Sequence, residues 1–259
     1  MPAAPPGRRR PGAGLRRAPG DAAVGGTPGV GRGVTVQLSR IPGLGGWDDD
    51  PLWAHFYDWS VEHRRLGGLA WRLGIQSDLG KLYAAAAEIG RQPAGSRVLD
   101  IPCGGGVALR GLKPGQGVEY VAADIAQTML DRTVRAAERR GVADQVEPRI
   151  ADVGDLPIDD GTFDLVVSFT GLHCFPDPQR AVVEMVRVLE PGGVLTGSAL
   201  LNDSGLHHEP LRRIGRAAGL LGPGCTGEEL VRWLESQRMA DVVLDRSGAI
   251  GYFRAVKRG

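Results

Sequence analysis

Short strand patterns alternate with helical patterns through the middle of this chain, and that alternation constrains the fold more than any other feature. The strand patterns are Arg97–Ile101, Glu119–Ala123, Val146–Ile150, Phe163–Phe169 and Val194–Leu200. Helical patterns occupy Ala126–Arg140 and Asp177–Leu189. Strands that alternate with helices predict a parallel sheet covered by helices on both faces. The segment after Asp164 is continuously apolar, as expected of a buried parallel strand.

The end of the chain breaks this alternation. Two further strand patterns, Asp241–Asp245 and Ile250–Val256, follow a helical pattern at Glu228–Ser236 and are separated by a short turn at Ser247-Gly248. A parallel connection needs a long crossover, whereas antiparallel strands can be joined by a tight hairpin. We therefore expect an antiparallel hairpin at one edge of the sheet.

A glycine-rich turn follows the first predicted strand. The strand ends in Asp100 and then turns through Gly104 and Gly106 into a predicted short helix. Glycine lets the backbone approach a ligand closely, and ligands of open α/β sheets bind at the carboxyl ends of the strands. The turn therefore indicates a ligand site, although a purely structural turn could have the same residues.

Carboxylates follow the next two strands at the same predicted edge. Asp124 ends the second strand, where a carboxylate can accept hydrogen bonds from both ribose hydroxyls of a nucleoside. Asp152 follows the third strand and could accept a hydrogen bond from the exocyclic amine of adenine. Two structural alternatives stay open: Asp124 as the cap of the following helix, and Asp152 as an exposed loop residue.

The turn departs from the dinucleotide fingerprint G-x-G-x-x-G. Leu109 stands at the position of the third glycine, which permits close packing of helix on strand. The phosphate-binding pattern G-x-x-x-x-G-K-[ST] is also missing from the sequence. A nucleoside cofactor without a pyrophosphate therefore fits this turn better than NAD.

Several segments, in their order and spacing, resemble those of class I S-adenosylmethionine-dependent methyltransferases. They are Val98–Gly106, Val121–Leu130, Ala151–Pro157, Phe163–Phe175 and Arg187–Leu195. They look most like the group that contains the ubiquinone- and menaquinone-biosynthesis methyltransferases and their small-molecule relatives. The resemblance implies a doubly wound, Rossmann-like α/β fold, with a seven-stranded sheet of order 3-2-1-4-5-7-6 and strand seven antiparallel. It also implies an enzyme that transfers a methyl group from S-adenosyl-L-methionine to a small-molecule acceptor.

The resemblance further implies cofactor contacts at particular positions. The residues expected along the methionine end of the cofactor are Asp100, Gly104 and Gly106. Asp124 is expected at the ribose, and the residues expected around the adenine are Ile125, Asp152 and Val153. The residues expected beside the cofactor after the fourth strand are Phe169, Thr170 and Leu172. Pro102 departs from the family, which usually has glycine there, but we expect the turn to persist because its two later glycines remain.

His173 is the candidate general base. It follows the fourth strand beside the expected methyl site, and a base is needed when the acceptor is an unactivated hydroxyl, carbon or protonated amine. The alternative is that His173 hydrogen-bonds the backbone or shapes the pocket. Cys174 is expected to pack rather than react. His207 and His208 are adjacent and would diverge on a helix, so no metal site is expected.

Composition narrows the functional classes. The three cysteines are widely spaced and form no C-x-x-C pair, which favours a reducing, cytoplasmic setting over a zinc site or disulfide framework. Residues 1–45 carry a net charge of +6, so the remainder carries −5. A mildly acidic body disfavours nucleic-acid binding. No stretch approaches the ~18 apolar residues that a membrane helix needs.

We divide the chain into a tail and one domain. Residues 1–45, rich in Arg, Pro, Gly and Ala, are expected to be disordered because they can bury little apolar surface. A start codon chosen too far upstream, or a targeting or RNA-binding arm, are alternatives. Residues 46–259 form the methyltransferase domain, with N-terminal helices at 46–94 and a lid at 202–224. Tyr57 and the lid are expected to line the acceptor pocket, and their Trp- and Leu-rich surroundings favour an apolar acceptor.

Two other functions stay open. One is a protein that binds the cofactor without catalysis, which nothing in the sequence opposes. The other is a different nucleoside-cofactor enzyme, such as an NAD-dependent oxidoreductase. Leu109 and the pair of Asp124 and Asp152 argue against that second possibility.

Overall fold

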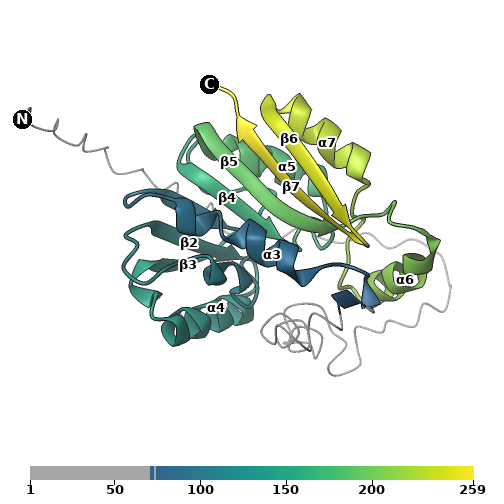
Figure 1. Ribbon diagram of the computed structural model, residues 1–259, viewed down its shortest axis with the longest axis horizontal. Helices are drawn as coiled ribbons and strands as arrows, with labels where there is room; N and C mark the ends of the chain where they lie inside the picture. Colours follow the sequence, from purple (N-terminus) through teal and green to yellow (C-terminus); the bar gives the residue numbers. More distant parts are fainter. Residues whose placement is uncertain (1–70, 73) are drawn as a thin grey trace, which may run out of the picture.

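A seven-stranded sheet of order β3-β2-β1-β4-β5-β7-β6 forms the centre of the molecule (Figure 1). The computed structural model describes residues 71, 72 and 74–259. The strands are β1 (Arg97–Asp100), β2 (Glu119–Asp124), β3 (Val146–Ile150), β4 (Phe163–Phe169), β5 (Leu189–Leu200), β6 (Met239–Ser247) and β7 (Ile250–Lys257). This order confirms the one that the family resemblance implies.

β7 runs against both of its neighbours. The pairs β1–β2, β1–β4, β2–β3 and β4–β5 are parallel, whereas β7 is antiparallel to β5 and to β6. Leu195 of β5 lies opposite Ala255, and Leu244 of β6 lies opposite Phe253. The expected C-terminal hairpin is therefore confirmed, and it lies at the sheet edge (Figure 1).

Helices cover both faces of the sheet. One face carries α3 (Leu79–Ala86) and α4 (Gln127–Arg140), and the other carries α5 (Pro178–Arg187) and α7 (Gly227–Ser236). Neighbouring residues of β1 show the origin of these two layers. Val98 packs into the core on the side of α3 and α4, while Leu99 packs into the core on the side of α5 and α7. Successive side chains of a strand point to opposite faces, so a strand covered on both sides is apolar throughout.

Side-chain caps fix the starts of three helices. Asp78 accepts a hydrogen bond from the Gly80 N–H at the start of α3. Asp177 accepts one from the Arg180 N–H at the start of α5. Thr226 and Glu229 form a reciprocal capping box at the start of α7. Such caps satisfy N–H groups that have no partner within the helix.

The segment after the glycine-rich turn differs from the expected short helix. It is a single 3-10 turn, Val107–Arg110. A Cβ placed on the following Gly111 would lie 1.8 Å from the Ala86 carbonyl oxygen, so the backbone here presses directly on the end of α3. The chain then turns at Lys113-Pro114-Gly115 and enters β2, which leaves too few residues for a longer helix.

The expected lid contains a helix that the sequence patterns did not predict. A 3-10 turn at Leu206–His208 leads into α6 (Glu209–Ala217) within residues 202–224. The tail expected at 1–45, Tyr57 and most of the helices expected at 46–94 lie outside the described residues. Within the described part of the chain, no helix is both long and apolar enough to cross a membrane.

Candidate functional site

The carboxyl ends of β1, β2 and β4 meet at one edge of the sheet. β1 lies between β2 and β4, and Asp100 is in register with Ala122 of β2 and with Val167 of β4. The three strands are parallel, so the loops that follow them emerge on the same side. This edge brings together the residues that the sequence assigns to a cofactor.

Backbone hydrogen bonds hold the glycine-rich turn against β2. The Cys103 N–H donates to the Ala123 carbonyl (2.9 Å), and the Gly104 N–H donates to Asp124 Oδ2 (3.0 Å). Gly104 and Gly106 both have positive φ, +51° and +83°, which favours glycine. The turn persists despite Pro102, whose peptide bond with Ile101 is cis.

The two glycines face different surroundings. A Cβ on Gly104 would meet nothing within 4 Å, so its backbone borders open space. A Cβ on Gly106 would lie 3.0 Å from Leu109 Cδ1 and 3.2 Å from the Ala136 Cβ. Gly104 is therefore placed to approach a ligand, whereas Gly106 allows the turn to pack on α4.

Asp124 links the turn to the start of α4. Its Oδ1 accepts a hydrogen bond from the Ala126 N–H (3.0 Å), while Oδ2 accepts the one from Gly104. The residue is 6% exposed. Asp124 is not the N-cap of α4: the N-cap is Ala126, which has no side-chain cap, and the bond from the Ala126 N–H to Asp124 closes a short turn before the helix. A ribose-binding role is compatible with these hydrogen bonds, because each carboxylate oxygen can accept more than one.

Asp100 is buried and paired with a residue that the sequence reasoning did not single out. The Tyr120 hydroxyl on β2 donates to Asp100 Oδ2 over 2.7 Å. Burial raises the pKa of Asp100 to about 8; the hydrogen bond from Tyr120 opposes this rise, and the nearby Asp124 charge adds to it. A tyrosine within an otherwise apolar strand was the available signal, but only the strand register shows its partner.

The residues expected around adenine lie beside Asp124 in different environments. The Ala151 N–H donates to the Asp124 carbonyl (3.0 Å), which holds the loop after β3 at this edge. Ile125 is 65% exposed and Val153 is buried. Asp152 is exposed, and its Oδ1 accepts a hydrogen bond from the Gly154 N–H (2.8 Å). The structure therefore brings these residues together without assigning them a ligand.

The end of β4 supplies the third side of this edge. Thr170 has a φ of +55°, a strained value for a β-branched residue, and its N–H donates to the Ser198 carbonyl (2.8 Å). Phe169 and Leu172 are buried, and Leu172 packs into the core on the side of α5. Burial, with a smaller contribution from Asp124, raises the pKa of Cys174 to about 12, so this thiol is not an activated nucleophile.

His173, in the segment after β4, forms hydrogen bonds with the end of β5 and with the segment before α7. Its Nδ1 accepts a hydrogen bond from the Leu200 N–H at the end of β5 (3.0 Å), and its carbonyl accepts one from the Gly222 N–H (2.8 Å). A backbone N–H can only donate, so in the neutral ring Nε2 carries the proton. Burial lowers the pKa of His173 to about 4. This geometry favours the backbone-bonding alternative over the role of a general base.

Comparisons with known proteins agree with this arrangement. A family model described as a methyltransferase domain matches residues 99–196, which run from β1 into β5. Residues 99–196 therefore carry a methyltransferase domain. The chain is 40% identical over 111 residues to the demethylmenaquinone methyltransferase of Thermus thermophilus, an alignment that covers 42% of this chain and 50% of that protein.

Two further relatives are informative. The 27-O-demethylrifamycin SV methyltransferase of Amycolatopsis mediterranei is 34% identical over 128 residues, covering 48% of this chain and 47% of that protein. Phosphoethanolamine N-methyltransferase 2 of Haemonchus contortus, solved with S-adenosyl-L-methionine, matches with a TM-score of 0.60 and 16% identity, covering 80% of this chain and 57% of that one. At that identity the structural match shows the fold alone. The chain spans about half the length of these curated relatives.

The groups at these strand ends suit S-adenosyl-L-methionine, with which the Haemonchus contortus neighbour was solved. Open space borders Gly104, and the Asp124 carboxylate is bonded to the N–H of that same residue. The exposed apolar side chain of Ile125 offers a surface on which an adenine ring could pack. Among the described residues, no group of three or more His, Cys, Asp or Glu side chains is placed to hold a metal ion.

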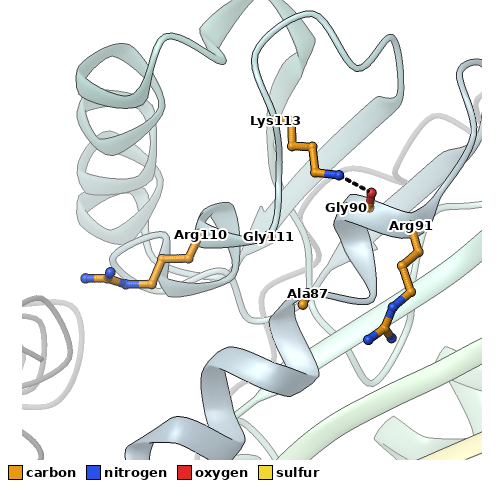
Figure 2. Close-up of a pocket in the computed structure, with 6 residues that line it drawn as sticks. All are labelled: Ala87, Gly90, Arg91, Arg110, Gly111 and Lys113. Atoms are coloured by element: carbon orange, nitrogen blue, oxygen red, sulfur yellow. Dashed lines mark hydrogen bonds between the residues drawn. The ribbon is translucent and has the colours of Figure 1, made fainter.

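A cavity of about 350 Å³ lies between the end of α3 and the turn before β2 (Figure 2). It is lined by Ala87, Gly90, Arg91, Arg110, Gly111 and Lys113. Figure 2 shows the guanidinium groups of Arg91 and Arg110 pointing away from each other. The Lys113 ammonium donates to the Gly90 carbonyl (3.0 Å). These cations do not converge on a common point, so we assign the cavity no role.

Proposed function

We propose that this chain transfers a methyl group from S-adenosyl-L-methionine to a small-molecule acceptor. The observation that carries the proposal is the joint placement of Gly104 and Asp124. A positive-φ glycine borders open space at the carboxyl end of β1, and its N–H is bonded to the carboxylate that ends β2. The family match supports the same reaction.

Each part of the cofactor would contact different residues of this site. Gly104 and Asp100 would lie along the methionine end, Asp124 would accept hydrogen bonds from the ribose hydroxyls, and Ile125 and Asp152 would flank the adenine. When bound, S-adenosyl-L-methionine supplies a methyl group already activated as a sulfonium. The chain's own contribution is then mainly to orient the acceptor, and alignment of reacting groups can lower a barrier by roughly 7–11 kcal/mol.

We further propose that residues 202–224 cover the acceptor. α6 buries Arg212, whose guanidinium donates to the Leu201 carbonyl (3.3 Å) and to Ser204 Oγ (2.9 Å). The same helix exposes Leu211 and Ile214. α6 therefore presents apolar side chains on its exposed face, and this face is consistent with an apolar acceptor.

The names of the relatives agree with a small-molecule acceptor. Relatives with 40% and 34% identity are described as acting on demethylmenaquinone and on 27-O-demethylrifamycin SV. His173 lies at the end of β4, where such an acceptor would approach. With Nδ1 engaged by the Leu200 N–H, we propose that it orients the acceptor as a hydrogen-bond donor through Nε2 rather than removing a proton.

Calorimetry on the full chain tests the cofactor assignment. Binding of S-adenosyl-L-methionine and S-adenosylhomocysteine is expected, with no comparable binding of NAD. Asp124→Ala should weaken binding by about 1–3 kcal/mol, through loss of hydrogen bonds to a charged acceptor. Asp144→Asn, a change of an exposed carboxylate in the turn before β3, should leave the affinity intact. Equal affinities for both variants and the wild type would refute the role of Asp124.

Methyl transfer itself needs a separate test. Metabolite extracts incubated with the chain and a donor labelled in its methyl group should yield a labelled small molecule. At a donor concentration near the wild-type Kd, the yield of labelled product should fall when Asp124→Ala replaces the wild type. A chain that binds the donor yet labels nothing, across extracts from several sources, would favour a cofactor-binding protein without catalysis.

A further inference from the structure

Tyr120 and Asp100 form a buried pair at the base of the glycine-rich turn. Each is 1% exposed, and the Tyr120 hydroxyl donates to Asp100 Oδ2 over 2.7 Å. Tyr120 lies opposite Val98 in the β1–β2 pairing, two residues before Asp100. Residues two apart on a strand share a face, so the phenol and the carboxyl group lie on the same side of the sheet.

The surroundings of Asp100 disfavour a permanent negative charge. Within the described part of the chain, the titratable groups that act on it are Tyr120 and Asp124 from β2 and Cys103 from the turn. β4 presents Val167 opposite it in register. Burial raises the pKa of Asp100 to about 8, the Tyr120 hydrogen bond acts in the opposite direction, and Asp124 adds to the rise. Near neutral pH a large share of Asp100 is therefore protonated.

A cation placed near the Asp100 carboxyl group would favour its ionised form over its protonated form. Two neighbouring carboxylates repel each other when both are ionised, and an opposite charge nearby favours the ionised form. The methionine end of S-adenosyl-L-methionine carries an ammonium group and a sulfonium. The hydroxyl of Tyr120 would then stabilise the carboxylate that faces them.

We propose that Tyr120 is a positioning residue that holds Asp100 ready to ionise, so that binding of the cofactor's cationic end releases the Asp100 proton to solvent. This inference rests on the proposed function. The proton balance is simple: the Asp100 carboxyl group loses one proton, and Tyr120 keeps the proton that it donates to Oδ2. No other bond changes.

The pH dependence of cofactor affinity should therefore depend on Tyr120. In the wild type, the affinity for S-adenosylhomocysteine should rise by up to about tenfold per pH unit below the Asp100 pKa and level off above it. Tyr120→Phe removes the hydrogen bond that favours the ionised carboxylate. The midpoint should then move upward by about one to two pH units, with about a tenfold or greater loss of affinity at pH 7.

Titration calorimetry between pH 6 and 9 with S-adenosylhomocysteine compares the pH profiles: the wild-type affinity should level off above about pH 8, whereas that of Tyr120→Phe should still be rising at pH 9. Buffers of different ionisation enthalpy count the protons released. Titration of the ligand's own amino group is common to every variant, so differences between variants report on the protein. Asp100→Asn should give a flat profile. Tyr252→Phe is the matched control, because Tyr252 is also a buried phenol (7% exposed) but bonds to Ser77 Oγ over 3.2 Å, far from Asp100 in sequence and across the sheet.

A second readout needs no ligand. The ¹³C resonance of the Asp100 carboxyl group, assigned by its loss in Asp100→Asn, should titrate at higher pH in Tyr120→Phe than in the wild type. An unchanged midpoint in Tyr120→Phe, or an equal shift in Tyr252→Phe, would overturn the role of Tyr120. Wild-type binding that does not vary with pH would overturn the coupling alone. No binding at any pH would overturn the coupling together with the proposed function.

Discussion

Replacing His173 with asparagine tests whether this residue stays uncharged in the folded protein, as its burial indicates. The asparagine Oδ1 can take the place of Nδ1 and accept the hydrogen bond that the Leu200 N–H donates over 3.0 Å. Asparagine does not titrate, so His173→Asn keeps the contact and removes the protonation equilibrium. At pH 7.5 its free energy of unfolding should lie within about 1 kcal/mol of the wild-type value.

The difference between the two proteins should appear on acidification. Burial lowers the pKa of His173 from 6.5 to about 4. The unfolded chain therefore takes up a proton near pH 6.5 that the folded protein refuses until about pH 4, and stability falls across this window. The shift corresponds to about 3 kcal/mol when the window has been crossed, of which about 2 kcal/mol is lost by pH 5.

Urea unfolding at pH 7.5, 6 and 5 would measure this loss. Both proteins lose stability in acid as their carboxylates become protonated, so the informative quantity is the wild-type free energy of unfolding minus that of His173→Asn. It should become more negative by about 2 kcal/mol between pH 7.5 and pH 5. A difference that stays constant within about 0.5 kcal/mol would refute the reasoning, since it would mean that His173 is protonated as easily in the folded protein as in the unfolded chain.

Two further predictions concern the stability of the fold. Gly104→Ala should lower the free energy of unfolding by about 1 kcal/mol, because only the positive φ of Gly104 opposes a side chain. Gly106→Ala should lower it by about 2–4 kcal/mol, because its Cβ would also crowd Leu109 and Ala136. Equal losses of stability for the two variants in thermal unfolding would contradict this. Glu184→Gln should lower the free energy of unfolding in urea by roughly 1–3 kcal/mol, because Glu184 accepts hydrogen bonds from the Leu156 N–H (2.9 Å) and the Arg187 guanidinium (2.8 Å). An unchanged free energy of unfolding would show that these contacts are not maintained in solution.

The sequence patterns predicted the sheet because the relevant signals are local. Each buried strand is a continuous apolar segment, and the short turn at Ser247-Gly248 excludes a parallel crossover. The strand order itself came from the family resemblance, since no local pattern specifies which strands become neighbours. Asp100 and Asp124 could be placed at one edge for the same reason: parallel strands carry their carboxyl ends together.

The missed features depend on contacts between distant residues. The bond between Tyr120 and Asp100 follows from the register of two strands, which neither strand specifies alone. The 3-10 turn at Val107–Arg110 follows from the approach of Gly111 to the Ala86 carbonyl on α3. The helix α6 was missed although Leu211 and Ile214 have helical spacing, because these side chains face outward and an arginine occupies the inner face.

The inward arginine of α6 has a thermodynamic consequence. Arg212 holds α6 to the end of β5 through the Leu201 carbonyl (3.3 Å), and its contacts with Ser204 (2.9 Å) and Glu209 (3.0 Å) lie within the segment itself. A segment held in this way can separate from the body while uncovering little hydrocarbon, so its opening should have a small heat capacity change and a free energy that varies almost linearly with temperature. The hydrocarbon that α6 does carry already faces outward before any such movement.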